Sequence, residues 1–289
     1  MTLASSPIIH HPFQFGIAGY QLTGFGIAVL MAFLIAQVVS ERELARRNQD
    51  REAAAVGDVL FAALLGTLIG AKLYFVIVVT HNVRDLWSRG GFVFWGGFMG
   101  AVALCAFTLR YKKLSFVRFA DVAGIAIAAG YAVGRTGCWA VGDDYGKPYS
   151  GPLAVAFPQG SPPSTVAEMQ NTFHVSFPTG TDPQSVVSVY PTQLFEVAMG
   201  LIMFGILWRL RDHDHAEGWL FGVWAVLAGM ERFIVEFFRA KDDRLAWTMG
   251  LSVAQLIALC MVAIGIAVMM ARRQPGPNRP GIHGEPAAA

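Results

Sequence analysis

Seven stretches of the chain are apolar, and short polar or charged segments separate them. They are Ile17–Val39, Val59–Thr80, Phe92–Leu109, Phe119–Trp139, Thr192–Leu210, Trp219–Phe238 and Leu251–Met270. A helix of about 20 mostly apolar residues can span the hydrocarbon core of a bilayer, because its backbone polar groups bond within the helix. The pattern therefore predicts an all-α integral membrane protein with seven transmembrane helices.

One connection, between the fourth and fifth helices, is much longer than the others. Residues 140–191 contain eight prolines, a density that prevents long helices. Connections of this length are usually functional or disordered. We expect an extracytoplasmic cap here, with one short strand near "LAVAF". Residues 1–271 would form the membrane domain, 140–191 its cap insertion, and 272–289 a Pro- and Gly-rich disordered cytoplasmic tail.

The composition agrees with a membrane protein. Hydrophobic residues make up 54% of the 289 residues and charged residues only 15%, against about 25% charged in soluble domains. A net charge of +2 gives no support for a nucleic-acid-binding protein. The three cysteines, Cys105, Cys138 and Cys260, are read as apolar packing residues, and their spacing indicates no disulfide framework or metal site. We therefore predict no metal or other cofactor.

The distribution of basic residues predicts the orientation. Thirteen Lys and Arg residues follow the odd-numbered helices, and six lie in the alternate segments. Basic residues are enriched on the cytoplasmic side of membrane proteins. The N-terminus should therefore lie outside and the C-terminus in the cytoplasm. No basic residue precedes the first helix and no cleavage site follows it, so we expect a retained helix and not a signal peptide.

Arg135 is one of three basic residues inside predicted helices, with Lys72 and Arg232. A charged side chain at the centre of a membrane helix costs about 3 kcal/mol or more, so such residues usually face a polar interior. Arg135 lies near the outer end of the fourth helix, and its guanidinium matches a phosphate or carboxylate with two parallel hydrogen bonds. The alternative is an ion pair with Glu196 or Glu236 that only ties helices together.

The sixth helix carries "ERFIVEFFR", in which Arg232, Glu236 and Arg239 follow one another at four and three residues. Those spacings place the three side chains on one helical face. Gln193 and Glu196 lie one turn apart at the outer end of the fifth helix. Three helices thus bring polar groups to one depth near the outer surface. We predict that this level binds a phospholipid headgroup, with the phosphate on Arg135 and Arg232.

Five motifs in order resemble those of the prolipoprotein diacylglyceryl transferase family. "GRTGCWAVGDDYG" (134–146) resembles the family signature, "YPTQLFE" (190–196) its HPSQLYE pattern, and "RFIVEFFR" (232–239) its RF-x-x-EF-x-R pattern. "GLSVAQL" (250–256) resembles its GLSMGQ pattern, and "GGFVFWGGFMG" (90–100) its F-x-GG-x-x-G element. The likeness covers most of the chain.

The resemblance implies transfer of a diacylglyceryl group from phosphatidylglycerol to the lipobox cysteine thiol of exported prolipoproteins, with release of glycerol phosphate. It implies a bacterial inner-membrane enzyme that needs no cofactor. Among the matching positions, the catalytic residues would be Arg135, Arg232, Glu236 and Asp143. The substrate-binding residues would be Tyr20, near the start of the first helix, with Trp95, Gly142, Gly146, Gln193, Glu196 and Arg239.

The sequence departs from the family pattern at several positions. Cys138 replaces an Asn, Asp143 a Glu, and Gln21 a Gly. Trp95 stands where the family often has His or Tyr, and an indole cannot accept a proton. The general base is therefore open. It is Asp143, Asp144 or Glu236, or the incoming thiol ionises in the field of the arginines.

Two other classes of protein compete with the enzyme. A non-catalytic or transport-type phospholipid-binding protein on the same scaffold needs the same headgroup site, and a structural membrane partner needs none. A transporter would also need polar residues that continue toward the cytoplasmic side. The inner halves of the seven segments are nearly free of charge, which favours chemistry at the outer level.

Overall fold

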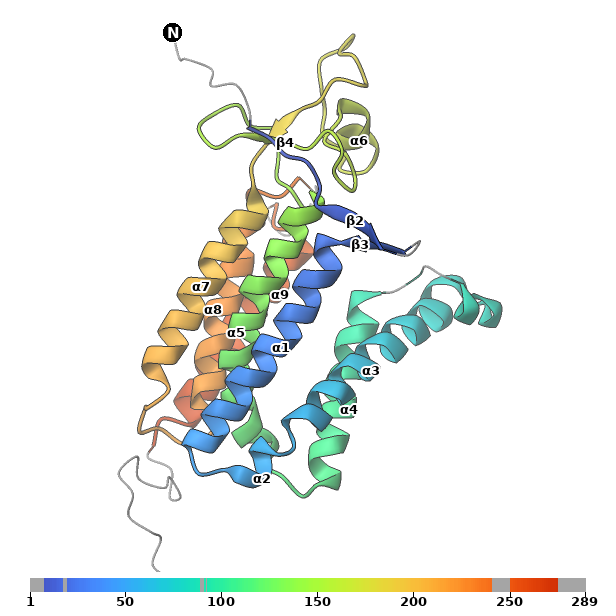
Figure 1. Cartoon of the computed structure of the whole chain (residues 1–289). Coiled ribbons are helices and arrows are strands. Elements are labelled where there is room, and N and C mark those ends of the chain that lie inside the picture. Colours follow the sequence, from blue (N-terminus) through green and yellow to red (C-terminus); the bar gives the residue numbers. More distant parts are fainter. Residues whose placement is uncertain (1–7, 18–19, 89–90, 92, 241–249, 275–289) are drawn as a thin grey trace, which may run out of the picture. The chain divides into compact units, whose positions relative to one another are not determined.

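The computed structural model describes residues 8–17, 20–88, 91, 93–240 and 250–274. Seven long helices lie within these residues (Figure 1). They are α1 (Gly24–Arg46), α3 (Val56–Tyr74), α4 (Phe94–Tyr111), α5 (Phe116–Val141), α7 (Thr192–Leu210), α8 (Trp219–Val235) and α9 (Val253–Ala271). Each lies within a few residues of one predicted segment, apart from the two ends of α1 and the C-terminal end of α3.

Five of the helical spans are long and apolar enough to cross a membrane. They are Gly24–Arg46, Val56–Thr80, Phe116–Val141, Thr192–Leu210 and Val253–Ala271. Many large apolar side chains on these helices are exposed, among them Leu30, Phe61, Ile202 and Ile264, each about 60% exposed. Contiguous apolar surface of this extent is unfavourable in water and favourable against lipid tails. The protein is an α-helical membrane protein.

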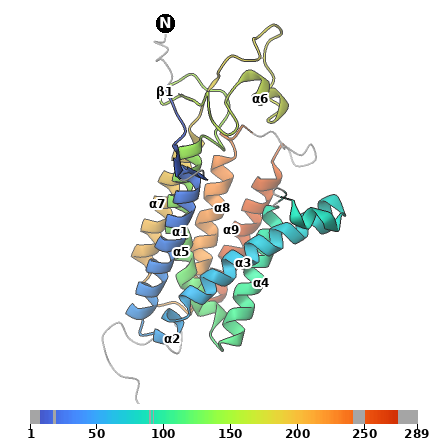
Figure 2. The ribbon, with the colours of Figure 1, turned by 45° about the vertical axis from the view of Figure 1, so that its right-hand side comes forward.

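The chain forms two compact units. The first takes in Met1–Ala36 and Gly124–Gly276, and the described part of the second is Gln37–Ala123. In the first unit, α5, α7, α8 and α9 run side by side (Figure 2). Small residues permit the close packing. A Cβ on Gly200 of α7 would lie 3.1 Å from the Cβ of Ala132 on α5, and a Cβ on Gly222 of α8 would lie 2.9 Å from the Gly265 carbonyl oxygen of α9.

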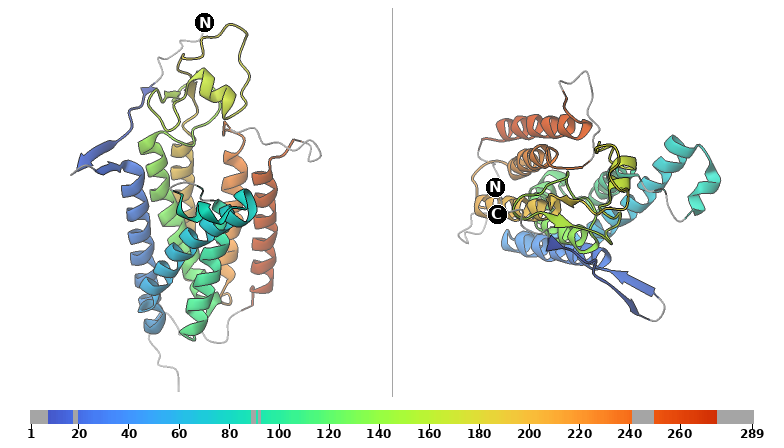
Figure 3. Two further views of the ribbon diagram at one scale, coloured as in Figure 1. Left: turned by 90° about the vertical axis from the view of Figure 1, so that its right-hand side faces the viewer. Right: turned by 90° about the horizontal axis from the view of Figure 1, so that it is seen from above.

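The segment between α5 and α7 forms a small folded layer at one end of these helices (Figure 3). It contains β4 (Val155–Ala156), in the predicted "LAVAF" stretch, α6 (Val166–Asn171) and β5 (Ser188–Val189). Its apolar core includes Tyr145, Phe157, Met169 and Val189. The strand belongs to a three-stranded sheet of order β1-β4-β5, which was not predicted. Its parallel edge strand, β1 (Ile8–Ile9), comes from the N-terminal segment.

The predicted start of the first helix at Ile17 is wrong. Strands β2 (Gln14–Ile17) and β3 (Tyr20–Thr23) form an antiparallel hairpin, and the helix begins at Gly24. The reason is local, because Thr23 Oγ1 accepts a hydrogen bond from the Gly26 N–H at 3.3 Å, as an N-cap residue does. The helix also runs beyond the predicted Val39 to Arg46, since Glu43 accepts hydrogen bonds from Arg46 and Arg47 on the last turns.

In the second unit, α3 and α4 pack through glycines. A Cβ on Gly70 would lie 2.2 Å from the carbonyl oxygen of Gly96, so only glycine allows this backbone contact. The second predicted segment was expected to continue as one helix to Thr80, but α3 ends at Tyr74 and Phe75–Thr80 form a π-helical segment. A 3₁₀ helix follows at Val83–Trp87. Lys72 Nζ donates to the carbonyl and hydroxyl oxygens of Ser88 at 2.8 and 2.9 Å. These bonds satisfy a buried ammonium group.

Two predicted boundaries need comment. The sixth segment was expected to reach Phe238, whereas α8 ends at Val235 and residues 236–238 form a turn that leads into the candidate site. The predicted disordered tail, 272–289, lies outside the described residues from 275 onward. The short helix α2 (Asp50–Ala53) was not predicted.

Candidate active site

Arg135 lies in the last two turns of α5 and donates to three side-chain oxygen atoms, besides its contact with the Cys138 sulfur. Its Nη2 donates to Glu196 Oε1 at 2.6 Å, its Nη1 to Asp144 Oδ2 at 2.9 Å, and its Nε to the Tyr131 hydroxyl at 3.3 Å. The side chain is only 16% exposed. The ion pair expected as the alternative role for Arg135 is therefore present with Glu196, and the guanidinium charge is compensated without a ligand.

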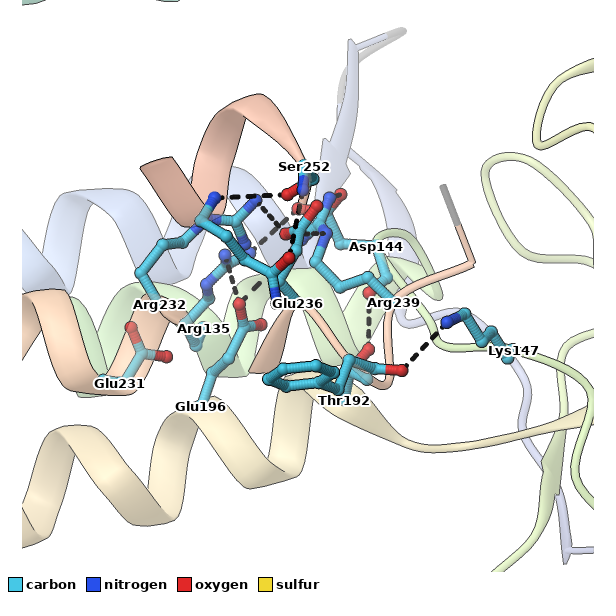
Figure 4. A network of polar contacts seen from close by, with 12 residues as sticks. Arg135, Asp144, Lys147, Thr192, Glu196, Glu231, Arg232, Glu236, Arg239 and Ser252 are labelled. Carbon is cyan, nitrogen blue, oxygen red and sulfur yellow. Dashed lines mark hydrogen bonds and ion pairs between the residues drawn. The ribbon is translucent and has the colours of Figure 1, made fainter. Parts of the chain in front are cut away.

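Arg239, four residues after the end of α8, contacts the same two carboxylates. Its Nη2 donates to Asp144 Oδ1 at 2.7 Å, and its Nη1 lies 3.9 Å from Glu196 Oε1. Asp144 thus bridges the two arginines with one oxygen on each (Figure 4). Arg135, Arg239, Asp144 and Glu196 form a closed ring of alternating charge, which we call the arginine ring.

Arg232 joins the ring through Glu236. Arg232 Nη2 lies 2.5 Å from Glu236 Oε2, and Arg239 Nε lies 3.9 Å from the same oxygen. Both contacts follow from the four- and three-residue spacings on one helical face. Glu236 is buried, with its side chain 3% exposed, and neither of its oxygens accepts a hydrogen bond of normal geometry. Arg135 and Arg232, the two arginines predicted to hold the phosphate, therefore belong to one connected cluster.

The N-terminus of α7 fixes the loop that follows α5. Gln193 Nε2 donates to the Asp143 carbonyl at 2.5 Å, and Thr192 Oγ1 donates to the Asp144 carbonyl at 2.7 Å. Asp144 adopts a left-handed backbone conformation, with a φ of 52°. Non-glycine residues hold this conformation only when their surroundings determine it. The backbone of Asp144 is thus placed so that its carboxylate reaches both arginines.

Asp144 was considered only as a candidate general base, and the structure shows a further contact for it. Asp143 was assigned the acidic position of the signature, which stays a prediction, and Asp144 is the aspartate that pairs with Arg135. Although burial opposes ionisation, the guanidinium groups of Arg239 and Arg135 hold the pKa of Asp144 below its usual range. Asp144 is therefore a carboxylate at neutral pH.

Asp143 has different surroundings. Its Oδ1 is buried and lacks a hydrogen-bond partner. Burial, with a contribution from the Asp144 charge, raises the pKa of Asp143 to about 6, against an opposing hydrogen bond from Cys138. Two adjacent carboxyl groups thus have pKa values shifted in opposite directions, an arrangement typical of sites that carry acid–base chemistry.

Cys138, Asp143 and Asp144 present ligand atoms within 4.8 Å of one another, close enough for a metal ion. The Arg135 guanidinium already occupies the neighbouring position, with Nη1 3.5 Å from Cys138 Sγ and 2.9 Å from Asp144 Oδ2. A metal ion placed among these atoms would face this positive charge at short distance. The geometry therefore favours the guanidinium over a metal at this position.

Gly142 and Gly146 shape the loop between α5 and the layer above it. Gly142 has a φ of 69°, and a Cβ there would lie 2.8 Å from the Phe157 ring. A Cβ on Gly146 would lie 2.5 Å from the Phe238 carbonyl oxygen. Both positions require glycine for backbone reasons. Their assignment as substrate-binding residues stays a prediction.

Two assigned residues cannot be placed at the site. Tyr20 lies in β3, not in a helix as expected, and its side chain is outside the described residues. Trp95 lies in the first turn of α4 in the second unit and is 43% exposed. The substrate-binding roles of Tyr20 and Trp95 stay predictions.

A second polar pair, which was not predicted, extends the cluster. Tyr131 donates its hydroxyl to Glu231 Oε1 at 2.9 Å, and Glu231 is buried within α8. The available signal was the acidic residue in the apolar stretch "AGMERF" and the four-residue spacing of Tyr131 and Arg135. A buried carboxylate in such a stretch needs a polar partner.

The described part of the site holds three guanidinium groups and five carboxyl groups, which are Asp143, Asp144, Glu196, Glu231 and Glu236. Several of its buried acceptor atoms have no hydrogen-bond partner, namely Asp143 Oδ1, Gln193 Oε1, Glu196 Oε2 and Glu236 Oε1. Buried acceptors are normally paired. The arrangement suits a ligand that brings both an anionic group for the arginines and hydroxyl donors for these acceptors.

The comparison with known proteins identifies the family. The family model described as prolipoprotein diacylglyceryl transferase matches residues 12–271. The chain is 27% identical to a phosphatidylglycerol–prolipoprotein diacylglyceryl transferase of Geobacter sulfurreducens, over 92% of this chain and 97% of that protein. It is 28% identical to the protein of that name from Stenotrophomonas maltophilia, over 91% of this chain and 92% of the relative. The chain belongs to the prolipoprotein diacylglyceryl transferase family.

Proposed function

We propose that the protein transfers the diacylglyceryl group of phosphatidylglycerol to the lipobox cysteine of exported prolipoproteins and releases glycerol phosphate. Family membership carries the reaction class, since the relatives are named for phosphatidylglycerol and prolipoprotein. The observation in this chain that supports it is the cluster of Arg135, Arg239 and Arg232 at the ends of apolar helices. A phosphodiester headgroup is the anion that a membrane offers at such a position.

The reaction is a substitution at carbon. The thiol sulfur forms a bond to the glyceryl carbon, and the bond from that carbon to the phosphate oxygen breaks. The electron pair stays on this oxygen, so the phosphate gains one negative charge as glycerol phosphate leaves. Guanidinium groups that face this oxygen stabilise the transition state more than the ground state. No electron acceptor is needed, in keeping with the prediction of no cofactor.

The proton of the thiol must pass to a base, and the surroundings favour Asp143. A base with a pKa near 6 is mostly ionised at neutral pH and can accept a thiol proton. Asp144 is a weaker base because Arg239 and Arg135 lower its pKa. Glu236 lies 2.5 Å from Arg232, and we assign it to the orientation of that guanidinium. Asp143 is the group to which we assign the proton.

We also propose that all seven long helices cross the inner membrane, with residues 140–191 as an extracytoplasmic cap. The excess of basic residues after odd-numbered helices supports this orientation. The pairing of β1 with β4 is a second argument, because it requires the N-terminal segment and the cap to lie on one side of the membrane. An impermeant maleimide should label Asp182→Cys but not Lys112→Cys in intact spheroplasts, and the reverse pattern would contradict the orientation.

The direct test of function is transfer by purified protein in phosphatidylglycerol vesicles. Labelled diacylglycerol should appear on a lipobox peptide, and Arg135→Ala and Arg232→Ala should each lower the rate by about a hundredfold or more. Arg209→Ala, a change at an exposed arginine of α7, is the matched control and should keep the wild-type rate. Binding of phosphatidylglycerol by the wild type without transfer would instead identify a lipid-binding protein, the alternative from the sequence.

A further inference from the structure

Asp144 occupies a place in the arginine ring that an anionic ligand would also take. Its two oxygens lie 2.9 Å from Arg135 Nη1 and 2.7 Å from Arg239 Nη2, so one carboxylate bridges two guanidinium groups. A phosphate presents oxygens to paired arginines with the same hydrogen-bond geometry. The carboxylate of Asp144 therefore makes the contacts that an incoming phosphate needs.

The charge balance of the ring makes these contacts exclusive. Two guanidinium groups and the two carboxylates of Asp144 and Glu196 sum to a formal charge of zero. A phosphate anion added to the intact ring would lie against carboxylates that already satisfy the arginines. Like charges at such distances disfavour binding. One carboxylate must therefore leave before the phosphate binds both arginines.

Asp144 is the carboxylate that can leave. Its side chain is 39% exposed, whereas that of Glu196 is fully buried within helix α7. Asp144 sits on the loop after α5, and its backbone is held independently of its side chain, through the carbonyl bond from Thr192. A rotation of the Asp144 side chain thus frees both guanidinium groups without moving a helix.

We infer that Asp144 is a resident anion that holds the Arg135–Arg239 pair ready for phosphate and sets the affinity of the site by competing with it. When phosphate enters, one anion replaces another, so the positive charge of the two arginines stays balanced. The competition lowers the affinity for phosphate and favours release of the phosphate product. This inference rests on the proposed binding of a phosphate group at these arginines.

Asp144→Asn tests the inference. Asparagine keeps the shape of the side chain and tolerates a positive φ, so the loop should fold. The change raises the formal charge of the ring from zero to +1, and we expect phosphate to bind about tenfold more tightly. Asp144→Glu restores the charge and should return the affinity toward the wild-type value. Asp182→Asn, the same change at an exposed position of the same segment, should leave it unchanged.

Two probes distinguish the source of the phosphate. Inorganic phosphate is titrated against the thermal midpoint of the detergent-solubilised protein, and phosphatidylglycerol in mixed micelles provides the KM for transfer. If only the affinity for inorganic phosphate rises in Asp144→Asn, Asp144 competes with the released phosphate product. If only the KM for phosphatidylglycerol falls, Asp144 competes with the lipid. Both results support the inference.

An unchanged or weaker affinity for both probes in a folded Asp144→Asn protein would overturn the inference, because a carboxylate that only ties the loop to α8 gives that result. The wild-type protein is assayed for transfer in parallel. Absence of transfer by the wild type would contradict the proposed function, while the phosphate titration would still decide the role of Asp144.

Discussion

The hydroxyl group of Tyr131 donates to Glu231 at 2.9 Å, and the same oxygen accepts a hydrogen bond from Arg135 Nε at 3.3 Å. Tyr131 and Glu231 lie on different helices, α5 and α8. Glu231 thus determines which way the tyrosine hydrogen points and leaves the oxygen lone pair free for the arginine. Tyr131 and Glu231 thus position the guanidinium group of Arg135 at its Nε, while Asp144 and Glu196 bind its Nη1 and Nη2.

Tyr131→Phe should lower transfer by about tenfold, because Arg135 loses one of its three oxygen partners and Glu231 loses its donor. The measurement is kcat/KM with a lipobox peptide, together with the thermal midpoint. Tyr145→Phe is the control, since it removes a hydroxyl that donates to the Pro163 carbonyl at 3.0 Å, outside the arginine cluster.

The two variants should lose similar stability, and only Tyr131→Phe should lose activity beyond that. Glu231→Gln combined with Tyr131→Phe should cost little more than either change alone, because the two residues act as a unit. Equal kcat/KM values for Tyr131→Phe and Tyr145→Phe would show that Tyr131 is only structural.

Asp143 should give the transfer reaction an acid limb. Burial raises its pKa to about 6, and the carboxylate form is the base, so kcat/KM should fall about tenfold per pH unit below pH 6. Asp143→Asn should have a low rate that lacks this limb. If kcat/KM of Asp143→Asn still falls below the same pH as in the wild type, the base is another group.

The raised pKa of Asp143 also determines how the stability of the fold changes with pH. The pKa of Asp143 is raised in the folded state from 3.8 to about 6, so its protonated form stabilises the fold and this contribution disappears as the pH rises through 6. Asp143→Asn should therefore raise the thermal midpoint at pH 8 more than at pH 5. A larger gain at pH 5 would contradict the assigned shift.

Gly146→Ala should disrupt the link between the loop after α5 and the end of α8. Its new Cβ would lie 2.5 Å from the Phe238 carbonyl oxygen and 2.7 Å from the Tyr190 Cβ, so the loop must move away from Arg239. We expect a loss of roughly 1–3 kcal/mol of stability, seen as a lower thermal midpoint, and a loss of transfer.

Gly205→Ala, where a Cβ would meet no atom within 4 Å, is the matched control and should leave the midpoint unchanged or higher. A Gly146→Ala protein with wild-type stability and activity would show that the loop accommodates the methyl group.

Periodic features of the fold could be predicted from the sequence, and features that depend on distant partners could not. The long apolar segments give helices near their predicted positions because helix length and apolarity are local properties. The strands Gln14–Ile17 and Tyr20–Thr23 were missed because their apolar residues, such as Ile17 and Leu22, extend the apolar stretch of the helix that follows. The pairing of β1 with β4 has no signal in either strand of two residues.

The site shows the same division. The spacing of Arg232, Glu236 and Arg239 predicted their common face, because that face depends only on helical geometry. The ion pair of Arg135 with Glu196 was among the alternatives expected, whereas its second carboxylate partner, Asp144, was not predicted, since neighbours on a turn point in different directions. The left-handed backbone of Asp144 and the bonds from Thr192 and Gln193 hold the loop in which the Asp144 carboxylate reaches the arginines.

The parallel pairing of Ile8 with Val155 has a consequence for biosynthesis. The first strand leaves the ribosome long before its partner, since about half of the chain lies between them. The three-stranded sheet can close only after Val189, at the end of β5, has been made. Until β4 has been made, the N-terminal segment has no strand to pair with, so completion of the sheet is a late event that follows synthesis of the four long helices between β1 and β4.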